Sequence, residues 1–375
     1  MIASKKLPDN LRTGIGNARN VHRYIFGDGK VTELTGLLAE KRESEADYVL
    51  YYVDEYFRDK KGGVLSRLPI GINDELVFVS TIIEPTTDYI DRLIEQLISK
   101  GKNKPYALVG IGGGITLDVT KAVSNLLTNK GLAQDYQGWD LVKVPGVYKI
   151  GIPTLSGTGA EATRTCVMTN KRNGLKLGMN SDHTVYDQLI LDPELTSTVP
   201  RHQYFYTGMD AYIHCLEALN GVYRNAIGDA FSEQAIQLCR DVFFSDDMMN
   251  DEGRRKIMVA SYLGGCAIAM SYVGLVHPFS AALSVVFDTH HTVANCITMR
   301  AMQEYYPEHY DEFWKMAEHQ GVEIPGGLCA SLPEELHDKL YEAMIVHEKP
   351  LTNALGKDFR NILTKDRARK IFEDM

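Results

Sequence analysis

Short runs rich in β-branched and aromatic residues alternate with amphipathic stretches through the first half of the chain. The runs occupy residues 48–53, 76–79, 107–111 and 149–153, and residues 89–98 carry apolar side chains at helical spacing. Short apolar strands that alternate with helices predict a parallel β-sheet covered on both faces. Ligands of such sheets bind at the carboxyl ends of the strands. Polar residues and glycines that directly follow these runs are therefore the first candidates for function.

The second half of the chain has a different pattern. Strand signals fade after about residue 195, and long helical patterns follow at residues 202–219, 228–243 and 254–270. A chain of 375 residues is longer than a single core usually supports. We therefore expect an α/β parallel-sheet domain over residues 1–192 and an all-helical domain over residues 193–375. Because no Gly/Ser-rich linker separates them, we expect the two domains to pack tightly and share a cleft.

Composition and charge exclude some classes of function. The formal net charge of -9 argues against nucleic acid as the main partner, because nucleic-acid binding usually needs a basic stripe. The six cysteines are scattered and include no Cys-x-x-Cys pair, which indicates reduced thiols and not a disulfide framework. The first residues lack the apolar core of a signal peptide, and no run of about 18 apolar residues predicts a membrane span. We expect a cytoplasmic protein.

One loop after a predicted strand has the composition of a phosphate-binding turn. Residues 109–121 run from a strand through Gly112, Gly113 and Gly114 into a helix that we expect to open around Leu117. Glycines allow a close backbone approach, and a helix N-terminus offers unpaired N–H groups and a partial positive charge to a phosphate. The spacing is neither the G-x-G-x-x-G fingerprint nor the Walker pattern. A tight turn without a ligand is therefore the alternative.

Two further strand ends carry polar residues that suit a nucleotide. The loop after residues 149–153 supplies hydroxyl groups at Thr154, Ser156 and Thr158, although an ordinary Ser/Gly loop is the simpler interpretation. Asp54 closes the first run, where an acidic residue can accept hydrogen bonds from a ribose diol and repel a 2′-phosphate. An acidic turn residue is the alternative there. Two such loops after neighbouring strands favour a bound ligand more than either loop alone.

Residue types that bind metals fall together in the predicted helical half. Asp210 and His214 are four residues apart, so a helix places both side chains on one face, where they can close on a single divalent metal. His277, His290 and His291 interrupt apolar stretches and are candidates to complete a four-ligand site. A lone histidine in an apolar run is more often a core residue, and spacing alone does not choose between His290 and His291. Other histidines are expected at the surface, among them His22, His183, His309, His319 and His337.

These motifs occur in the same order in one known family. The glycine run with Asp118 and Lys121, the Pro-Thr-x-Ser-Gly-Thr-Gly-x-Glu loop, the Gly-Met-Asp-Ala-x-x-His segment, and His277 fourteen residues before His291 are its parts. Together they resemble the iron-containing (group III) alcohol dehydrogenases. The turn at residues 26–29 and the Leu-Asp-Pro-Glu-Leu segment also fit, and the resemblance spans about residues 20–300.

The resemblance implies a dehydroquinate synthase-like fold, with an N-terminal dinucleotide-binding α/β domain and a C-terminal all-helical domain. It places a divalent metal, Fe²⁺ or Zn²⁺, in the cleft between them and implies NAD(P) as cofactor. The implied metal ligands are Asp210, His214, His277 and His291, the last chosen over His290 by the Val-Ala-Asn that follows it. The implied cofactor contacts are Asp54, Gly113, Gly114, Asp118, Thr154, Thr158 and Lys176.

Two positions depart from the family pattern. Many members have a second histidine four residues after the first of the late pair, beside the nicotinamide and the substrate, where this chain has Ala281. We therefore expect a different proton relay or substrate shape, with the proton leaving through Thr289, His290 or water. His290 is the catalytic candidate among these, and a supporting or surface histidine is its alternative role. Ile115 replaces the usual serine after the glycines, which leaves the phosphate contact at that position open.

The implied function is metal-dependent oxidation of an alcohol, in which the metal polarises the substrate hydroxyl and a hydride passes to nicotinamide. The segments around His277 and His291 are most similar to the subgroup of 3-deoxy-D-manno-octulosonate (Kdo) 8-oxidases, which are linked to an 8-amino sugar of lipopolysaccharide. We therefore expect an alcohol or sugar-acid substrate, whose carboxylate Arg164, Lys171 or Arg201 can hold. A homodimer and a pathway aminotransferase are further expected partners; nucleic acid and membrane are not.

Three other functions compete with Kdo oxidation. One is NAD(P)-dependent conversion of a simple alcohol or aldehyde. A dehydroquinate synthase-like lyase is another, but it needs basic residues around a phosphate, and residues 210–217 and 277–291 contain no Lys or Arg. The last is a non-catalytic binding module. Structural zinc sites are usually closed and rich in cysteine, whereas the donors here are a carboxylate and histidines, which ranks this module lowest.

Overall fold

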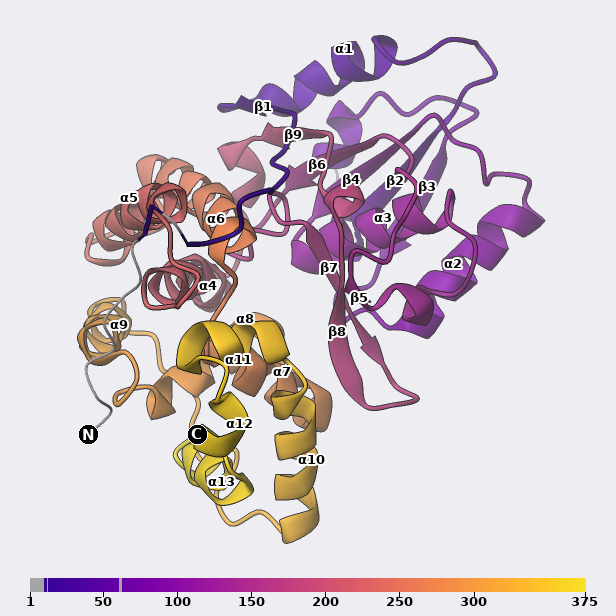
Figure 1. Ribbon diagram of the computed structural model, residues 1–375. Helices are drawn as coiled ribbons and strands as arrows, with labels where there is room; N and C mark the ends of the chain where they lie inside the picture. Colours follow the sequence, from indigo (N-terminus) through magenta and orange to yellow (C-terminus); the bar gives the residue numbers. More distant parts are fainter. Residues whose placement is uncertain (1–9, 12, 61–62) are drawn as a thin grey trace. The chain divides into compact units, whose positions relative to one another are not determined.

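The computed structural model describes residues 10–11, 13–60 and 63–375 (Figure 1). Its contacts divide the chain into two compact units. One unit is Arg19–Val199, and the other joins the described residues before Arg19 to Pro200–Met375. The expected division into an α/β domain over residues 1–192 and an all-helical domain over residues 193–375 stays a prediction.

The first unit is built on a six-stranded sheet. Its strand order is β1 (Arg23–Phe26), β9 (Gln188–Leu191), β6 (Lys149–Pro153), β4 (Ala107–Gly112), β2 (Val49–Asp54) and β3 (Glu75–Val79). Every pairing in this sheet is parallel, which confirms the predicted architecture. The four inner strands are buried along their whole length, whereas the edge strands β1 and β3 are partly exposed. Burial on both faces explains why the inner strands are continuous apolar runs.

Helices cover both faces of this sheet, as the alternating pattern predicts (Figure 1). Leu50, Tyr52 and Leu108 point to one face, where they share a buried core with α2 (Thr87–Ser99) and α3 (Gly114–Leu126). The next residues along β2 and β4, among them Tyr51, Val53 and Val109, share a second core with α1 (Leu34–Ala39) and the short helix before it. Successive side chains of a strand point to opposite faces of the sheet, so alternate residues of β2 and β4 reach the two different cores.

A second, three-stranded sheet in the same unit was not predicted. It contains β5 (Gly138–Trp139), β8 (Leu175–Asn180) and β7 (Thr165–Asn170), in that order. β7 and β8 form an antiparallel hairpin, and Gly174 in its turn has a φ of 67°. Buried and half-buried residues alternate along β7. That period of two is a strand signal, and the short polar strands around it made it easy to miss.

Beyond Pro200, the described secondary-structure elements of the second unit are all helices. Its helices are α4 (Arg201–Leu219), α5 (Ala226–Phe243), α6 (Asp251–Ser271), α7 (Val276–Phe287), α8 (His291–Thr298), α9 (Pro307–His319), α10 (Glu334–Ile345), α11 (Glu348–Leu355), α12 (Phe359–Ile362) and α13 (Lys365–Glu373). The three predicted helices match α4, α5 and α6, each of which begins one to three residues earlier. Asn225 and Asn250 explain two of these starts, because each side chain accepts a hydrogen bond from the backbone N–H three residues later.

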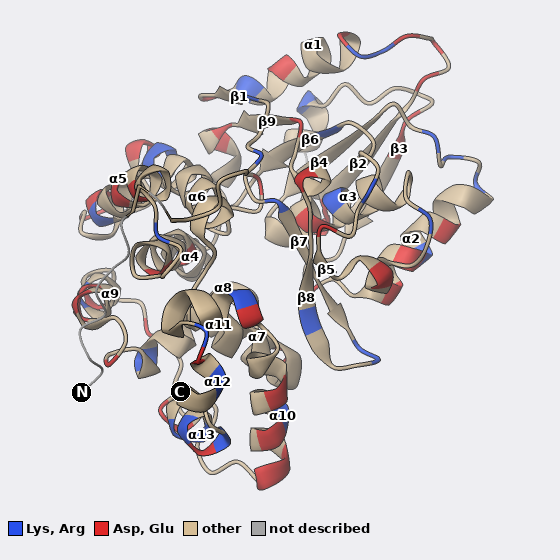
Figure 2. Cartoon of the chain, in the orientation of Figure 1, with Lys and Arg blue, Asp and Glu red and all other residues tan. Residues whose placement is uncertain are grey.

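Acidic residues line α10 and basic residues line α13 (Figure 2). Lys365 Nζ lies 2.5 Å from Asp338 Oδ1, and Arg369 Nη1 lies 3.1 Å from Glu334 Oε2. Exposed ion pairs of this kind contribute little to stability. The apolar side of α13 holds the helix instead, where the ring of Phe372 packs against Phe279 of α7 with centroids 4.7 Å apart.

The buried thiols and the apolar helices bear on two expectations from the sequence. All six cysteines lie among the described residues, are buried and are free of disulfides. In the part of the chain that the structure describes, no single helix is long and apolar enough to cross a membrane. One bent pair, α6 with α7 at 106°, passes the same test on length and composition.

Candidate active site

Helix α4 presents Asp210 and His214 on one face, as their spacing predicts. Both side chains are almost completely buried, and His214 Nε2 lies 3.5 Å from Asp210 Oδ1. The two residues lie one turn apart on the same helix, so the distance between their side chains depends little on loop motion.

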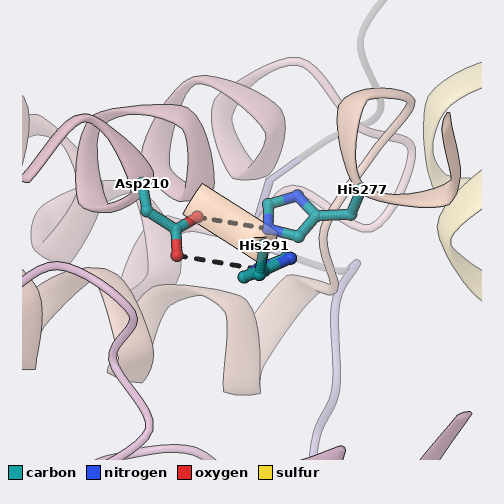
Figure 3. A group of neighbouring side chains, drawn as sticks. All are labelled: Asp210, His277 and His291. Atoms are coloured by element: carbon teal, nitrogen blue, oxygen red, sulfur yellow. Dashed lines mark ion pairs between the residues drawn. The ribbon is translucent and has the colours of Figure 1, made fainter. Parts of the chain in front are cut away.

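Helices α7 and α8 bring two more histidines to Asp210 (Figure 3). His277 is the second residue of α7 and His291 is the first residue of α8. His277 Nε2 lies 3.5 Å from Asp210 Oδ1, and His291 Nε2 lies 3.7 Å from Asp210 Oδ2. One ligand atom from each of the three residues falls within 4.8 Å of the other two. His277 and His291 follow Asp210 by 67 and 81 positions in the sequence, and the three residues thus form one compact group of metal-ligating atoms.

His214 lies beside this group and not within it. Its ring stacks on the ring of His277, with centroids 4.7 Å apart and an interplanar angle of 15°. The group that meets the spacing of a metal site is Asp210, His277 and His291. The role of His214 as fourth ligand stays a prediction, as do the other ligand roles.

The charges of these groups depend on one another. Burial alone would raise the pKa of Asp210, but the neighbouring His214, His291 and His277 hold the pKa of that carboxyl well below its usual range. Burial lowers the pKa of His214 to about 4. Burial also opposes the charged form of His277, but the carboxylates of Glu217 and Asp210 raise the pKa of His277 to about 9. Asp210 is therefore an anion at every physiological pH, which is the form that binds a cation.

The hydrogen-bond pattern of the Asp210 carboxylate is the one expected of a metal ligand. Asn295 Nδ2 donates to Asp210 Oδ1 at 2.7 Å, so one carboxylate oxygen is held in place. The other oxygen, Oδ2, is buried and has no hydrogen-bond partner. A buried carboxylate oxygen without a hydrogen bond is costly unless something else, such as a cation, satisfies it. A carboxylate with imidazole nitrogens is a donor set that suits Zn²⁺ or Fe²⁺.

Two residues around this group were missed from the sequence, Asn295 and Glu217. Asn295 Nδ2 lies 3.3 Å from His291 Nε2 and 3.5 Å from His277 Nε2, in addition to its bond to Asp210. Glu217 Oε2 lies 2.5 Å from His277 Nδ1. Both follow a candidate ligand at helical spacing, because Asn295 is four residues after His291 and Glu217 three residues after His214. Searching the helix faces of the ligands would have found them.

The other histidines are placed differently. His290 is half-buried and occupies the N-cap position of α8, where its carbonyl accepts a hydrogen bond from Ala294 N. Its side chain is not part of the compact group, and its catalytic role stays a prediction. His337 was predicted at the surface, and this was wrong. It is buried on the inner side of α10, with Nε2 4.0 Å from Glu373 Oε1.

In the first unit, the carboxyl ends of three neighbouring strands bring the predicted nucleotide loops together. β2 ends at Asp54, β4 at Gly112 and β6 at Pro153. Gly112 pairs with Pro153 in register, and Thr154 N donates to Gly112 O at 3.0 Å. The glycine loop and the hydroxyl loop therefore leave the same edge of the sheet side by side.

The glycine loop packs too closely for side chains. Helix α3 begins at Gly114, three residues before the predicted start at Leu117. A Cβ at Gly114 would lie 3.0 Å from Thr158 Oγ1, and a Cβ at Gly113 would lie 2.7 Å from Leu155 Cδ1. The tertiary contact between the two loops overrides the low helix propensity of glycine at this helix start. Such a helix start is suited to a phosphate.

Two charged residues of the same unit, Asp118 and Lys176, are also among the predicted cofactor contacts. Asp118 Oδ2 accepts a hydrogen bond from Val167 N, and burial raises the pKa of Asp118 to about 6. Lys176 of β8 is buried, with Nζ 2.9 Å from Glu84 Oε2. Glu84 was not predicted, because nothing in its local sequence indicates that it meets a lysine far along the chain.

Several polar atoms near these loops have no partner within the protein. Among the described residues, Asp118 Oδ1, Ser156 Oγ and Thr116 Oγ1 are buried and lack hydrogen bonds. Buried groups of this kind normally find a partner, so a polar ligand such as a dinucleotide fits here. Asp54 accepts from Tyr56 N at 3.0 Å, and burial raises its pKa. The predicted cofactor contacts are consistent with this arrangement and stay predictions.

Comparison with known proteins identifies the family. The model of the iron-containing alcohol dehydrogenases matches residues 21–193, and the model of the C-terminal part of the same family matches residues 204–345. The chain therefore belongs to the iron-containing alcohol dehydrogenase family, as the ordered motifs indicate.

Individual relatives agree with this assignment. The chain is 34% identical to a sulfoacetaldehyde reductase of Bilophila wadsworthia, over 58% of this chain and 56% of the relative. It is 33% identical to an NAD-dependent methanol dehydrogenase of Bacillus methanolicus, over 52% of this chain and 51% of the relative. The matched region thus spans about half the length of these curated relatives. Among solved structures, an alcohol dehydrogenase from Oenococcus oeni has the same fold, with a TM-score of 0.81 at 20% identity over 96% of this chain and 99% of that chain.

Proposed function

We propose that this chain interconverts a primary alcohol and the corresponding aldehyde, with a divalent metal and NAD. The observation that carries the proposal is the compact group of Asp210, His277 and His291, in which the buried Asp210 Oδ2 has no hydrogen-bond partner. When bound, the metal supplies a Lewis acid for the substrate oxygen and NAD supplies the hydride acceptor. The other parts of the reaction fall to the residues of the chain.

Those residues have separable tasks in this proposal. Asp210 is the ionised metal ligand, and a hydrogen bond from Asn295 orients its carboxylate. The side chain of His291 is 28% exposed, whereas Asp210 is fully buried, so His291 marks the side from which a substrate reaches the group. In the first unit, the N–H groups at Gly114 hold a diphosphate and Asp54 holds a ribose diol.

The rival functions lack support of this kind. α7 and α8 contain no Lys or Arg, which disfavours a lyase that must hold a phosphate beside the histidines. The group contains no thiolate, which disfavours a closed structural zinc site.

For the substrate, we propose a sugar acid oxidised at a primary hydroxyl, with C8 of Kdo as the specific candidate. The similarity of the α7 and α8 segments to Kdo 8-oxidases supports this, and so does Ala281. One turn after His277 on α7, Ala281 leaves more room than the histidine of many relatives. Two turns after His277, the Ser284 hydroxyl is buried without a hydrogen-bond partner. We propose lipopolysaccharide synthesis in the cytoplasm as the setting, with a homodimer as the assembly and an aminotransferase acting on the aldehyde.

The suggested carboxylate-binding cations are differently engaged. Arg164 Nη2 lies 3.0 Å from Asp182 Oδ1 and also pairs with Asp140. Arg201 donates to the side-chain and backbone oxygens of Gln320. Lys171 is exposed. Of the three, Lys171 is the one whose charge no ion pair or hydrogen bond in the described structure already uses.

A substrate screen tests both levels of the proposal. Anaerobically purified protein, loaded with Fe²⁺ or Zn²⁺, is assayed for NAD(P) reduction with Kdo, methanol and 1-propanol, and for NADH oxidation with sulfoacetaldehyde. We expect kcat/KM for Kdo to exceed that for the simple alcohols at least about 100-fold, which corresponds to roughly 3 kcal/mol of transition-state binding. Preference for a simple alcohol or sulfoacetaldehyde would overturn the substrate proposal alone. Metal-loaded protein that turns over none of them would overturn the proposed activity.

Asp54 should set the preference for NAD over NADP. A carboxylate at the ribose repels a 2′-phosphate, and like charges held together cost up to several kcal/mol. We expect Asp54→Ser to raise kcat/KM with NADP about tenfold or more relative to NAD. Steady-state assays with both cofactors measure this ratio, with Asp59→Ser as a control just beyond the strand. An unchanged ratio in Asp54→Ser would show that Asp54 does not face the ribose.

A further inference from the structure

Glu217 is a buried carboxylate beside the candidate metal group. It lies on α4, three residues after His214, and its side chain is completely inaccessible to solvent. Burying a carboxylate is costly unless hydrogen bonds or a cation compensate. Its partners therefore indicate its role.

Both oxygens of Glu217 bind the start of α7. Oε2 lies 2.5 Å from His277 Nδ1. Oε1 accepts hydrogen bonds from Val276 N at 2.6 Å and from His277 N at 3.4 Å. One side chain thus holds the ring of His277, its backbone and the residue before it.

This arrangement fixes which ring nitrogen of His277 carries a proton. Oε1 of Glu217 already accepts from two backbone N–H groups, and a carboxylate that accepts at both oxygens leaves the hydrogen between Oε2 and the ring on Nδ1 of His277. Nε2 then faces Asp210, 3.5 Å from its Oδ1, and offers its lone pair there once no proton occupies it. We propose that Glu217 is a positioning residue that keeps His277 protonated at Nδ1 and aims Nε2 at the metal, an inference that rests on the proposed metal site.

Other residues hydrogen-bond to the backbone of the loop before α7 rather than to the ring of His277, and they can be compared with Glu217. Tyr272 has a φ of 74°, which is strained for a residue other than glycine, and Asn353 Nδ2 donates to its carbonyl at 3.1 Å. Leu275 N donates to Tyr306 Oη at 3.1 Å. Asn353 and Tyr306 therefore hold the backbone of this loop, whereas Glu217 also holds the ring of His277.

Replacement of the carboxylate by an amide reverses one of these contacts. In Glu217→Gln, one terminal atom becomes a donor. If that donor faces His277 Nδ1, the ring must accept there and carry its proton on Nε2, which blocks the metal. If it faces Val276 N, two donors oppose each other. Carboxylate partners of ligating histidines are worth roughly 10–100-fold in metal affinity.

The experiment compares wild type, Glu217→Gln and Tyr306→Phe as full-length metal-free proteins. Zinc affinity is measured by competition with a chromogenic chelator, and protonation of the ring nitrogens by NMR of ¹⁵N-histidine-labelled protein with and without zinc. We expect about 10–100-fold weaker zinc binding in Glu217→Gln and less than about threefold change in Tyr306→Phe. Nδ1 of His277 should carry a proton in wild type and Tyr306→Phe, in both the metal-free and zinc-bound forms. The share of His277 rings protonated at Nδ1 should fall in metal-free Glu217→Gln, because one of the two amide orientations presents a donor to Nδ1.

Two outcomes would overturn the inference. One is Glu217→Gln with wild-type zinc affinity, and the other is Nδ1 of His277 unprotonated in the wild type. Circular dichroism of the metal-free proteins checks folding. If Glu217→Gln does not fold, Glu217→Asp keeps an acceptor but withdraws it from the ring, and unchanged zinc affinity there overturns the inference equally. Wild type that binds no zinc would contradict the proposed metal chemistry, while the protonation of Nδ1 in the metal-free protein still decides the role of Glu217.

Discussion

Asp210→Asn should remove the bound metal and lower kcat/KM for alcohol oxidation by at least about 1000-fold, since Lewis-acid stabilisation is worth several kcal/mol and about 4 kcal/mol corresponds to this factor. The substitution keeps the shape of the side chain but removes the charge. Asp210 is the carboxylate that all three histidines approach, and its pKa is held well below the usual range. The wild-type carboxylate therefore stays ionised across the physiological pH range, and only the substitution removes its charge. Metal analysis and steady-state kinetics measure the two effects.

The control for this prediction is Asp241→Asn. Asp241 is an exposed aspartate on α5 that pairs with Lys256, so its substitution removes the same charge at a position outside the group of Asp210, His277 and His291. We expect wild-type metal content and activity in this variant. Full metal content in Asp210→Asn would show that the carboxylate is not a ligand. NADH binding should survive Asp210→Asn, because the glycine loop belongs to the other unit of the chain.

Gly114→Val should have the converse effect, loss of dinucleotide binding with metal content preserved. A Cβ at Gly114 already lies 3.0 Å from Thr158 Oγ1 and 3.2 Å from its Cγ2, and valine adds two further methyl groups at the first turn of α3. Those methyl groups displace the hydroxyl loop or cover the N–H groups that would hold the diphosphate. We expect the Kd for NADH to rise at least about 30-fold, or roughly 2 kcal/mol.

Fluorescence titration with NADH measures this change. The matched control is Gly36→Val in α1 of the same unit, where nothing lies within 4 Å of an added Cβ. That variant should bind NADH like the wild type. Tight NADH binding by folded Gly114→Val would show that the dinucleotide does not approach the start of α3. Together with Asp210→Asn, the two variants separate the metal from the cofactor.

The parallel sheet could be predicted from the sequence because its inner strands are buried on both faces. Burial makes β2, β4 and β6 continuous apolar runs, and their observed bounds differ from the predicted ones by at most one residue. The β7–β8 hairpin gives a weaker signal, because its strands are half-buried and carry polar residues. The start of α3 could not be placed either, since the contact of Gly114 with Thr158 decides it and local propensity does not.

The candidate metal group was predictable for a similar physical reason. The i, i+4 spacing of Asp210 and His214 and the isolated histidines in apolar runs are local patterns. The surrounding hydrogen bonds are not, because Glu217 meets His277 across 60 positions of sequence and Asn295 meets Asp210 across 85. The sequence also did not indicate that His214 would stack on His277 outside the compact group.

In the proposed function, the carboxylate of α4 and the histidines of α7 and α8 bind the metal on which alcohol oxidation depends. Metal content and NAD-linked turnover are measured for anaerobically purified wild type, His291→Ala and His290→Ala. His291 Nε2 lies 3.7 Å from Asp210 Oδ2, whereas the adjacent His290 caps α8. We predict that His291→Ala loses metal and turnover, and that His290→Ala retains its metal. Metal retained in His291→Ala and lost in His290→Ala would contradict the assignment of His291 as a metal ligand.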